Sequence, residues 1–253
     1  MRVVTIQNKK GGVGKTTFLL HLAHRAVELK LRTLVIDLDT QANASTGLTH
    51  DYGLLKVPGG SAAIFTVERP EDLPIRTVRP LLDLLHGHTR LDEVDSLFDV
   101  SYLKNRFLPK QVPLLRSLPY DLILFDTAPS AGPRQIAPLF LANRVLIPII
   151  ADEFAVSGLA QTRDDVEAAR TINPAIQTTV LVNMFRANSR SQRQALFQLQ
   201  TITAIPLRQP FFPLRDHVPA AISTGVPVWA FKTAKPPLRA LWRNFATETL
   251  GWQ

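Results

Sequence analysis

The sequence contains no cysteine, and it lacks any long apolar run. Without cysteine there are no disulfide bonds and no thiolate metal sites, which is typical of a cytoplasmic protein. No stretch approaches the roughly 18 apolar residues of a membrane helix. The chain opens directly on the strand-like run Arg2–Ile6, without a charged and then apolar leader. We therefore expect a cytoplasmic protein without stable membrane insertion, and no DNA-reading extension ahead of the first strand.

Acidic residues are scarce in the last quarter of the chain. From Arg186 onward only Asp216 and Glu248 oppose nine Lys and Arg residues, so this part carries +7 of the net +8. A surface this basic implies a polyanionic partner, either nucleic acid or an anionic membrane. A solvated arginine-rich surface without such a partner is the alternative interpretation.

A glycine-rich segment, Lys9–Thr17, follows the β-branched run Val3–Ile6 and precedes a helical pattern. Strand, loop and helix in this order form a phosphate-binding loop, in which glycines let backbone N–H groups face a polyphosphate. Lys15 would contact the β- and γ-phosphates, and the Thr16 hydroxyl would bind Mg²⁺. The sequence therefore predicts a nucleoside triphosphate site rather than a glycine-rich surface turn. The residues expected around the nucleotide phosphates are Gly11, Gly12, Val13, Gly14, Lys15, Thr16 and Thr17.

Four further apolar runs read as buried strands: Thr33–Asp39, Asp121–Asp126, Arg144–Ile150 and Gln177–Asn183. Unbroken apolar runs are typical of central strands in parallel sheets, and ligands bind beyond the carboxyl ends of such strands. Three of the four runs end in Asp or Asn, which places polar side chains at that edge. We predict an α/β fold with a doubly wound, mainly parallel sheet, forming a single domain over residues 1–253.

The loop has an early lysine, Lys10, and reads Lys-Gly-Gly-x-Gly-Lys-Thr. It resembles the deviant Walker A loop of the ParA/MinD family of P-loop ATPases. Segment Asp37–Ser45 resembles the family motif Asp-x-Asp-Pro-Gln-Gly-Asn, with Thr40 in place of proline and Ala42 in place of glycine. Segment Asp121–Ser130 resembles the Walker B motif and switch II of the same family.

The resemblance implies roles for the matching residues. Lys10 of one subunit would reach the phosphates of its partner's nucleotide, and Asp39 would orient the attacking water. Asp37 would support the Mg²⁺ shell, and Asp126 would hold a Mg²⁺-bound water. Asn183 would hydrogen-bond adenine. Since the guanine-specifying Asn-Lys-x-Asp motif is absent, ATP is expected rather than GTP.

The resemblance also implies a function, that of a ParA-like ATPase for plasmid or chromosome partition. ATP would join two subunits into a sandwich homodimer that binds non-specific DNA and so associates with the nucleoid. Hydrolysis, weak alone and stimulated by a centromere-binding ParB-like adaptor protein, would release the DNA. A MinD-like membrane-associated positioning ATPase and a conjugation or cargo-positioning ATPase of the same fold are alternatives. A metabolic enzyme similar to dethiobiotin synthase is disfavoured, because nothing beyond the nucleotide motifs suggests a small-molecule pocket.

The chain ends in a helical pattern, Leu238–Leu250, introduced by Pro236-Pro237. Leu238, Trp242 and Phe245 fall on one face of this helix. It could pack on the core, face DNA, or lie on a membrane as an amphipathic helix. The basic residues considered for DNA contact are Lys232, Lys235, Arg239 and Arg243.

The middle of the chain, residues 46–120, carries fewer signals. Val78–Leu85 and Leu91–Leu108 show patchy helical periodicity. The run His86-Gly87-His88 is expected to form a surface turn, because no third type of metal ligand lies nearby. The sequence assigns no function to this region beyond connecting the second and third motifs.

Overall fold

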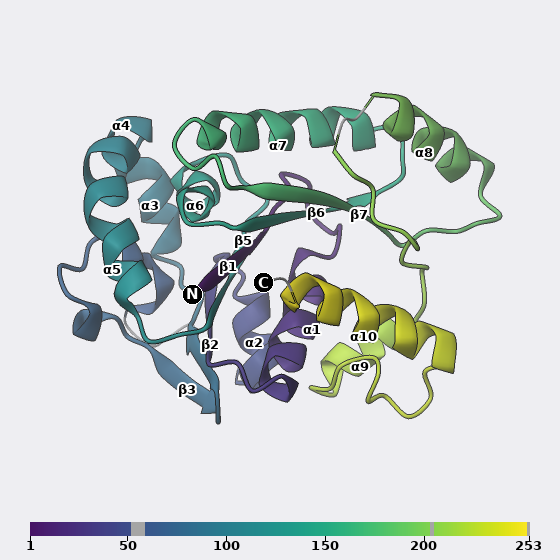
Figure 1. Cartoon of the computed structure of the whole chain (residues 1–253), viewed down its shortest axis with the longest axis horizontal. Coiled ribbons are helices and arrows are strands. Elements are labelled where there is room, and N and C mark those ends of the chain that lie inside the picture. Colours follow the sequence, from purple (N-terminus) through teal and green to yellow (C-terminus); the bar gives the residue numbers. More distant parts are fainter. Residues whose placement is uncertain (52–58, 203–204, 252–253) are drawn as a thin grey trace.

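One seven-stranded sheet forms the centre of the molecule in the computed structural model, which describes all residues except 52–58, 203–204 and 252–253. The strand order is β3-β4-β2-β5-β1-β6-β7. Every neighbouring pair is parallel except β3 and β4. Helices cover both faces of the sheet (Figure 1). The predicted α/β class with a mainly parallel, doubly wound sheet is confirmed.

The predicted apolar runs form the central strands. The strands are β1 (Arg2–Ile6), β2 (Thr33–Leu38), β3 (Arg76–Arg79), β4 (Leu82–Leu85), β5 (Leu122–Thr127), β6 (Arg144–Ile150) and β7 (Gln177–Asn183). The α-helices are α1 (Lys15–Glu28), α2 (Asn43–Thr49), α3 (Leu91–Leu97), α4 (Val100–Tyr102), α5 (Val112–Ser117), α6 (Pro133–Ile136), α7 (Ala155–Arg170), α8 (Arg190–Ile202), α9 (His217–Ser223) and α10 (Pro236–Leu250). Short 3₁₀ segments cover Gly60–Phe65, Pro70–Asp72 and Ala137–Phe140, and a π-helix covers Leu103–Gln111.

Two apolar layers enclose the sheet because neighbouring residues of each strand face opposite sides. Val4 and Val35 pack with α1, α2, α9 and α10 in one cluster. Val3 and Leu34 face the other side, where α3, α5 and the π-helix cover the sheet. Further along that side, α7 and α8 pack on β6 and β7. Figure 1 shows α7 and α8 above the sheet and α1, α9 and α10 below it.

Helix α10 packs on the core through the face that the sequence indicated. Trp242 and Phe245 are buried, with ring centroids 5.0 and 5.2 Å from that of Phe18 in α1. Phe212 completes this aromatic cluster at 4.8 Å from Trp242. The core-packing interpretation is confirmed, and the face that would enter a bilayer is already covered. Among the described helices, none has the length and apolar composition that a membrane crossing needs.

The helical expectation for Val78–Leu85 is wrong, because this segment contributes to strands β3 and β4. Leu81, at φ 69°, makes the turn between them. Leu82 and Leu84 then pair with Thr33 and Val35 of β2. Periodicity cannot distinguish strand from helix in so short an apolar run, and pairing with β2 decides the outcome.

The helical expectation for Leu91–Leu108 holds, with one interruption. Helix α3 ends at Leu97, and Asp99 begins the next helical segment by accepting a hydrogen bond from the Tyr102 backbone N–H at 2.7 Å. This helical region lies on the sheet face opposite α1 (Figure 1).

Candidate nucleotide-binding site

The sequence motifs meet at one edge of the sheet. Strand β1 lies between β5 and β6 in the sheet. After β1 the chain forms β2, β4 and β5 on one side of it, and then β6 and β7 on the other side. A strand order that diverges in this way opens a crevice at the carboxyl ends of the strands. The loop after β1 occupies that crevice, with the ends of β2 and β5 on one side and those of β6 and β7 on the other.

The glycine-rich loop needs glycine at two positions. Gly12 and Gly14 have φ values of 73° and 97°, which side-chain-bearing residues rarely adopt. A Cβ on Gly14 would also lie 2.4 Å from Nδ2 of Asn183. That Nδ2 donates to the Val13 carbonyl at 2.9 Å, so Asn183 is packed against the loop.

Lys15 lies at the start of α1 with its side chain folded into the loop. Its Nζ donates to the carbonyls of Asn8 and Lys10 at 3.0 and 3.1 Å, and the residue is 7% exposed. Burial lowers the pKa of this ammonium, while the nearby carboxylates of Asp126 and Asp39 oppose that shift. A phosphate group would add further negative charge beside this buried cation and favour its charged form.

Asn8 is a site residue that the sequence analysis missed. Its Oδ1 accepts from the Lys10 backbone N–H, and its Nδ2 donates to the Pro148 carbonyl, both at 2.8 Å. The side chain therefore fixes the beginning of the loop to β6. A polar residue between an apolar strand and a glycine-rich turn was the available signal.

Asp37 and Asp126 face each other across the paired strands β2 and β5. Both carboxyl groups are buried. Burial, with the neighbouring carboxylate, raises the pKa of Asp126, and burial raises the pKa of Asp37 to about 6. Asp126 Oδ2 accepts from the Thr16 hydroxyl at 2.7 Å. Two buried acids and a hydroxyl thus gather at the end of the phosphate loop.

The oxygens of Asp37 are already engaged by protein donors. Oδ1 accepts from the Asp39 backbone N–H at 3.1 Å, and Oδ2 accepts from the backbone N–H and hydroxyl of Ser45 at 2.8 and 2.7 Å. Asp37 therefore shapes the segment that carries Asp39. Ser45 lies within the motif that the sequence analysis quoted, but its contact with Asp37 was not foreseen.

Ala42 replaces the glycine of the family motif at a left-handed position, with φ 48°. Ala42 N–H donates to the Asp39 carbonyl at 2.9 Å, which closes a turn. Gly87 accommodates that turn, because a Cβ on Gly87 would lie 2.4 Å from the Asp39 carbonyl and 2.9 Å from the Ala42 Cβ. The absence of a side chain at Gly87 therefore leaves room for the Ala42 side chain.

The expectation of a surface turn at His86-Gly87-His88 is wrong for its first two residues, which are buried. Gly87 N–H donates to the Ser45 hydroxyl at 2.9 Å, and the His86 carbonyl accepts from the Ser61 N–H at 2.8 Å. The turn follows β4, which pairs with β2, so it packs on the Asp37–Ser45 segment. Among the described residues no group of three or more His, Cys, Asp or Glu side chains is arranged to hold a metal.

Lys10 lies on the surface of the site, paired with an acid of its own chain. Its Nζ forms an ion pair with Asp152, which follows β6, and lies 5.8 Å from the ring centroid of Phe154. The side chain of Lys10 is 35% exposed. The neighbouring Lys9 pairs with Asp165 of α7 at 2.8 Å.

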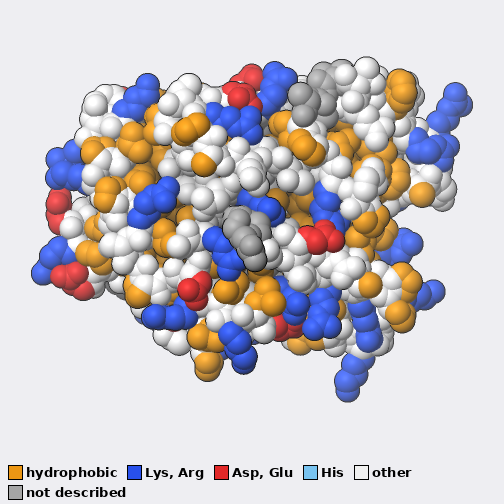
Figure 2. Space-filling view, in the orientation of Figure 1, with side chains coloured by type: hydrophobic (Ala, Val, Ile, Leu, Met, Phe, Trp, Pro, Cys, Tyr) orange, Lys and Arg blue, Asp and Glu red, His pale blue; other side chains and the backbone are white. Residues whose placement is uncertain are grey.

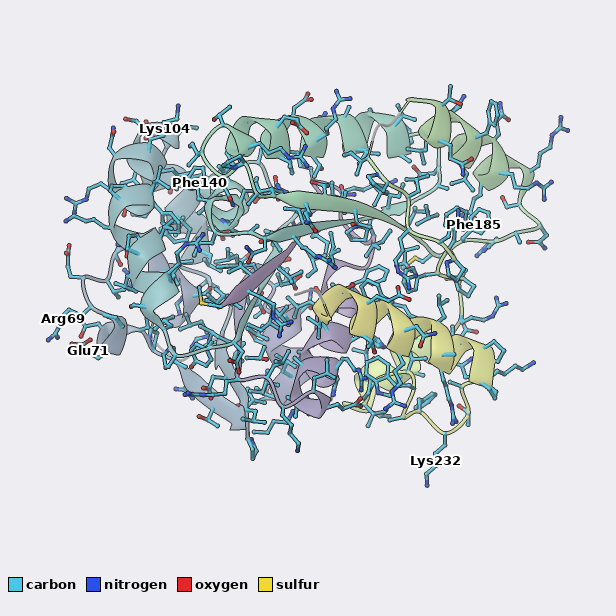
Figure 3. The ribbon with its side chains drawn as sticks, in the orientation of Figure 1. Arg69, Glu71, Lys104, Phe140, Phe185 and Lys232 are labelled. Carbon is cyan, nitrogen blue, oxygen red and sulfur yellow. The ribbon has the colours of Figure 1, made fainter. Side chains whose placement is uncertain are left out.

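The late proline-containing segment lies beside Asn183. Phe212 N–H donates to the Val182 carbonyl, and Phe185 N–H donates to the Phe212 carbonyl, both at 2.9 Å. Phe185 lies at the end of β7, next to this segment (Figure 3). These bonds hold residues 210–213 beside the carboxyl end of β7.

The four basic residues considered for DNA contact have different surroundings. Arg239 Nη2 donates to the carbonyls of Phe231 and Lys232, which ties the guanidinium to the preceding loop. Arg243 lies 3.8 Å from Glu28 of α1. Lys232 and Lys235 are exposed and form no ion pair with a described residue. Lys232 points away from the body of the protein below α10 (Figure 3).

Comparison with known proteins identifies the family. The AAA domain family matches residues 1–178. The chain is 32% identical to Escherichia coli protein IncC over 243 residues, which cover 92% of this chain and 64% of IncC. It is 31% identical to the chromosome partitioning protein ParA of Caulobacter vibrioides over 204 residues, which cover 77% of this chain and 74% of ParA.

The fold also matches solved structures. A Cyanothece McdA variant in complex with ATP superposes with a TM-score of 0.81 at 20% identity, covering 100% of this chain and 97% of that one. This likeness concerns the fold, since identity is low. The family match and the relatives in sequence carry the assignment: the chain belongs to the AAA domain family and, within it, to the ParA group of partition ATPases.

Proposed function

We propose that this chain binds ATP with Mg²⁺ at the loop after β1 and hydrolyses it to drive plasmid or chromosome partition. The observation that carries the proposal is the buried Lys15 ammonium at 7% exposure, held inside a glycine-rich loop beside two buried acids. An ammonium and adjoining backbone N–H groups bind the phosphates of a nucleotide, to which the N-terminus of α1 adds its dipole. The remaining loop residues, Gly11, Val13 and Thr17, complete this cradle.

A magnesium ion fits the donors that are present. Mg²⁺ is usually held by one or two protein oxygens together with substrate phosphates and waters. Thr16 and Asp126 would supply the protein oxygens, and the buried Asp126 Oδ1 has no hydrogen-bond partner among the described residues. Asp37 would support the site through its charge and through the segment it shapes. The ion neutralises charge that develops on the phosphates during transfer.

Within this site we assign the hydrolytic step to Asp39. It follows the end of β2, and its backbone position is fixed by the Asp37 carboxylate. A carboxylate beside the γ-phosphate can hold the attacking water in line. Asn183, held against Val13, would contact the adenine on the other side of the loop.

ATP would bring two subunits together through the edge that carries Lys10. Lys10 is partly exposed, and Phe154 beside it is 62% exposed, which leaves an apolar ring next to a charge at this edge. In the dimer Lys10 would exchange Asp152 for the phosphates of the partner's nucleotide. The negative charge of ATP thus supplies the driving force for assembly.

The DNA surface would lie between α10 and the loop that leads into α8. A groove of about 960 Å³ there is lined by Arg186, Arg215 and Lys235, among other residues. Figure 2 shows Lys and Arg side chains along the edge of the molecule that these two helices form. Cations spread over an exposed surface bind phosphate without reading bases. We therefore place DNA contact on these residues and Lys232, and assign Arg239 a structural role.

Release would follow hydrolysis, stimulated by a centromere-binding adaptor of the ParB type, and the ATP-bound dimer would associate with the nucleoid. The membrane-bound alternative has less support, because the apolar face of α10 is buried. The adaptor would determine whether a plasmid or a chromosome region is moved.

The test is binding to random-sequence duplex DNA, with ATP, with ADP and without nucleotide, across a salt series. We expect binding only with ATP and a steep fall in affinity with salt, because counterions are released from phosphate. Sedimentation with anionic liposomes is the parallel control. Lipid binding without DNA binding would contradict the partition proposal and favour a membrane-bound positioning ATPase.

A further inference from the structure

The Asp95 carboxylate of α3 accepts several hydrogen bonds from the loop that follows β5. Asp95 Oδ2 accepts from Arg134 Nε at 2.8 Å and lies 2.7 Å from Arg134 Nη2. The other oxygen accepts from the Arg134 backbone N–H at 3.3 Å. The Ser130 hydroxyl donates to Oδ2 at 3.4 Å. Donors from both ends of the turn 130–134 therefore converge on one side chain from a distant part of the sequence.

The loop is shaped to receive this carboxylate. Gly132 has φ 153°, and a Cβ on it would lie 2.7 Å from Asp95 Oδ1. Only glycine allows the loop to pass so close to the acid. The Arg134 side chain is 7% exposed, and its nearer counter-ion is Asp95 at 2.7 Å, ahead of the 72% exposed Asp92 at 3.5 Å. Removing one partner of a buried ion pair leaves an uncompensated charge, which is strongly unfavourable.

The same loop reaches the phosphate site. It follows Asp126 and Thr127 at the end of β5, and the Thr127 hydroxyl donates to the Ile6 carbonyl at 2.8 Å, which fixes this end to β1. Between the two fixed ends, Pro129 lies beside the phosphate loop. A Cβ added to Gly11 would be 4.0 Å from the Cγ of Pro129, which is van der Waals contact. The loop is therefore held by β1 at one end and by α3 at the other, with its middle beside the phosphate-binding segment.

We infer that Asp95 is a positioning residue for ATP hydrolysis, acting through Ser130 and Arg134. It holds residues 128–134 against the phosphate loop, so that the groups around the γ-phosphate are in place before the reaction. Preorganisation of this kind lowers the barrier of the chemical step more than it strengthens ground-state binding. This inference rests on the proposed ATPase function, and it gives helix α3, in the region without sequence signals, a part in catalysis.

The first experiment separates turnover from binding. We expect Asp95→Ala to lower kcat about ten-fold or more while the Kd for ATP stays within about three-fold of the wild-type value. Glu93→Ala is the matched control. Glu93 is on the same helix, but its carboxylate pairs with Arg90 at 3.5 Å, so Glu93→Ala should leave kcat unchanged. Asp95→Asn, which keeps the volume and one acceptor oxygen, serves if the alanine variant does not fold.

The second experiment asks whether the two side chains act as a unit. If they do, the double variant Asp95→Ala/Arg134→Met should lose no more kcat than the more damaging single variant. Amide hydrogen exchange over residues 128–134 gives a readout without nucleotide. Exchange there should be about ten-fold faster in Asp95→Ala than in the wild type, and unchanged in Glu93→Ala.

The outcomes distinguish this inference from the proposed function. If the wild type neither binds nor hydrolyses ATP, the ATPase proposal fails, whatever the exchange data give. If the wild type hydrolyses ATP and Asp95→Ala does so at the same rate or faster, Asp95 is not a positioning residue. Additive losses in the double variant, or exchange unaltered over 128–134, would also overturn the inference.

Discussion

The nucleotide site and the basic C-terminal surface differ in how directly sequence translates into geometry. At the nucleotide site, Lys15, Thr16 and Asp126 come together because strand pairing places Asp126 beside the loop and side-chain hydrogen bonds hold Lys15 and Thr16 in it. On the C-terminal surface, Arg239 binds carbonyls while Lys235 remains exposed, although the two are four residues apart. A motif that the backbone defines thus predicts positions, whereas a count of charges predicts only that a surface is basic.

The largest effect should come from Lys15→Ala at the nucleotide site. The variant removes the ammonium from the phosphate cradle, and we expect ATP affinity to fall about a thousand-fold, by isothermal titration calorimetry. Lys9→Ala is the control from the same segment, because Lys9 pairs with Asp165 rather than facing the loop interior. Unchanged affinity in Lys15→Ala would refute the assignment of the phosphate loop.

The next effect should come from Asp39→Ala, which we expect to lower kcat by a few hundred-fold and to leave ATP binding intact. ATP-bound dimers should then accumulate, as measured by light scattering after gel filtration. Asp39→Asn can still accept the hydrogen bond from the Gln41 N–H, seen at 2.9 Å, but loses the charge. Normal hydrolysis by the Asn variant would show that the charge of Asp39 is not needed.

A third prediction concerns His21, which joins α1 to the C-terminal segment. Nδ1 lies 2.7 Å from the Thr17 carbonyl, and Nε2 accepts from the Val228 N–H at 3.2 Å, so the neutral ring satisfies both contacts. Burial lowers its pKa to about 4. Because the folded state disfavours protonation of His21, the neutral ring contributes to the free energy of unfolding. This stabilisation is complete above about pH 6.5 and is lost as pH falls toward 4.

The loss from His21 should approach about 3 kcal/mol of unfolding free energy, by urea titration at several pH values. His21→Gln should flatten the profile over this range. Some slope should remain, because burial and Arg79 lower the pKa of His24 to about 3 in the same direction. An unchanged profile in His21→Gln would mean that His21 does not link the two regions through its protonation.

The smallest effects should come from the basic surface. We expect the double variant Lys232→Ala/Lys235→Ala to weaken DNA binding several-fold and to reduce the salt slope by up to about two, because each lost phosphate contact lowers it by about 0.9. Arg239→Ala should instead mainly lower thermal stability, since its guanidinium holds the loop at Phe231. If Arg239→Ala reduces the salt slope as much as the lysine pair, this separation of roles is wrong.

Most of the fold could be predicted because its central strands are continuous apolar runs. Strands β6 and β7 match the expected bounds, and β2 differs by one residue. Strands β3 and β4 were missed, because Val78–Leu85 has no periodicity that distinguishes a strand from a helix. The assignment of β4 depends on β2, which lies more than 40 residues away in the sequence, and β3 pairs with β4.

The residues of the candidate site likewise fall into those that the sequence identified and those that it did not. Lys15, Asp39 and Asp126 could be identified because the residues that define each motif are close in sequence. Asn8 was missed although its place between an apolar strand and a glycine-rich turn was a signal. Asp95 could not be identified, because its partner Arg134 lies far along the chain. A single Asp in an acidic helix gives no sign of the guanidinium that it will meet.

The sequence by itself determined the phosphate loop, the order of the main strands and the excess of positive charge. These features follow from local backbone preference, from the burial of apolar runs and from composition. Only the tertiary structure decided that α10 is a core helix, that Arg239 is tied to its own loop, and that α3 holds the loop after β5. Each of these depends on which distant side chains become neighbours, and the free energy of such contacts exists only in the packed molecule.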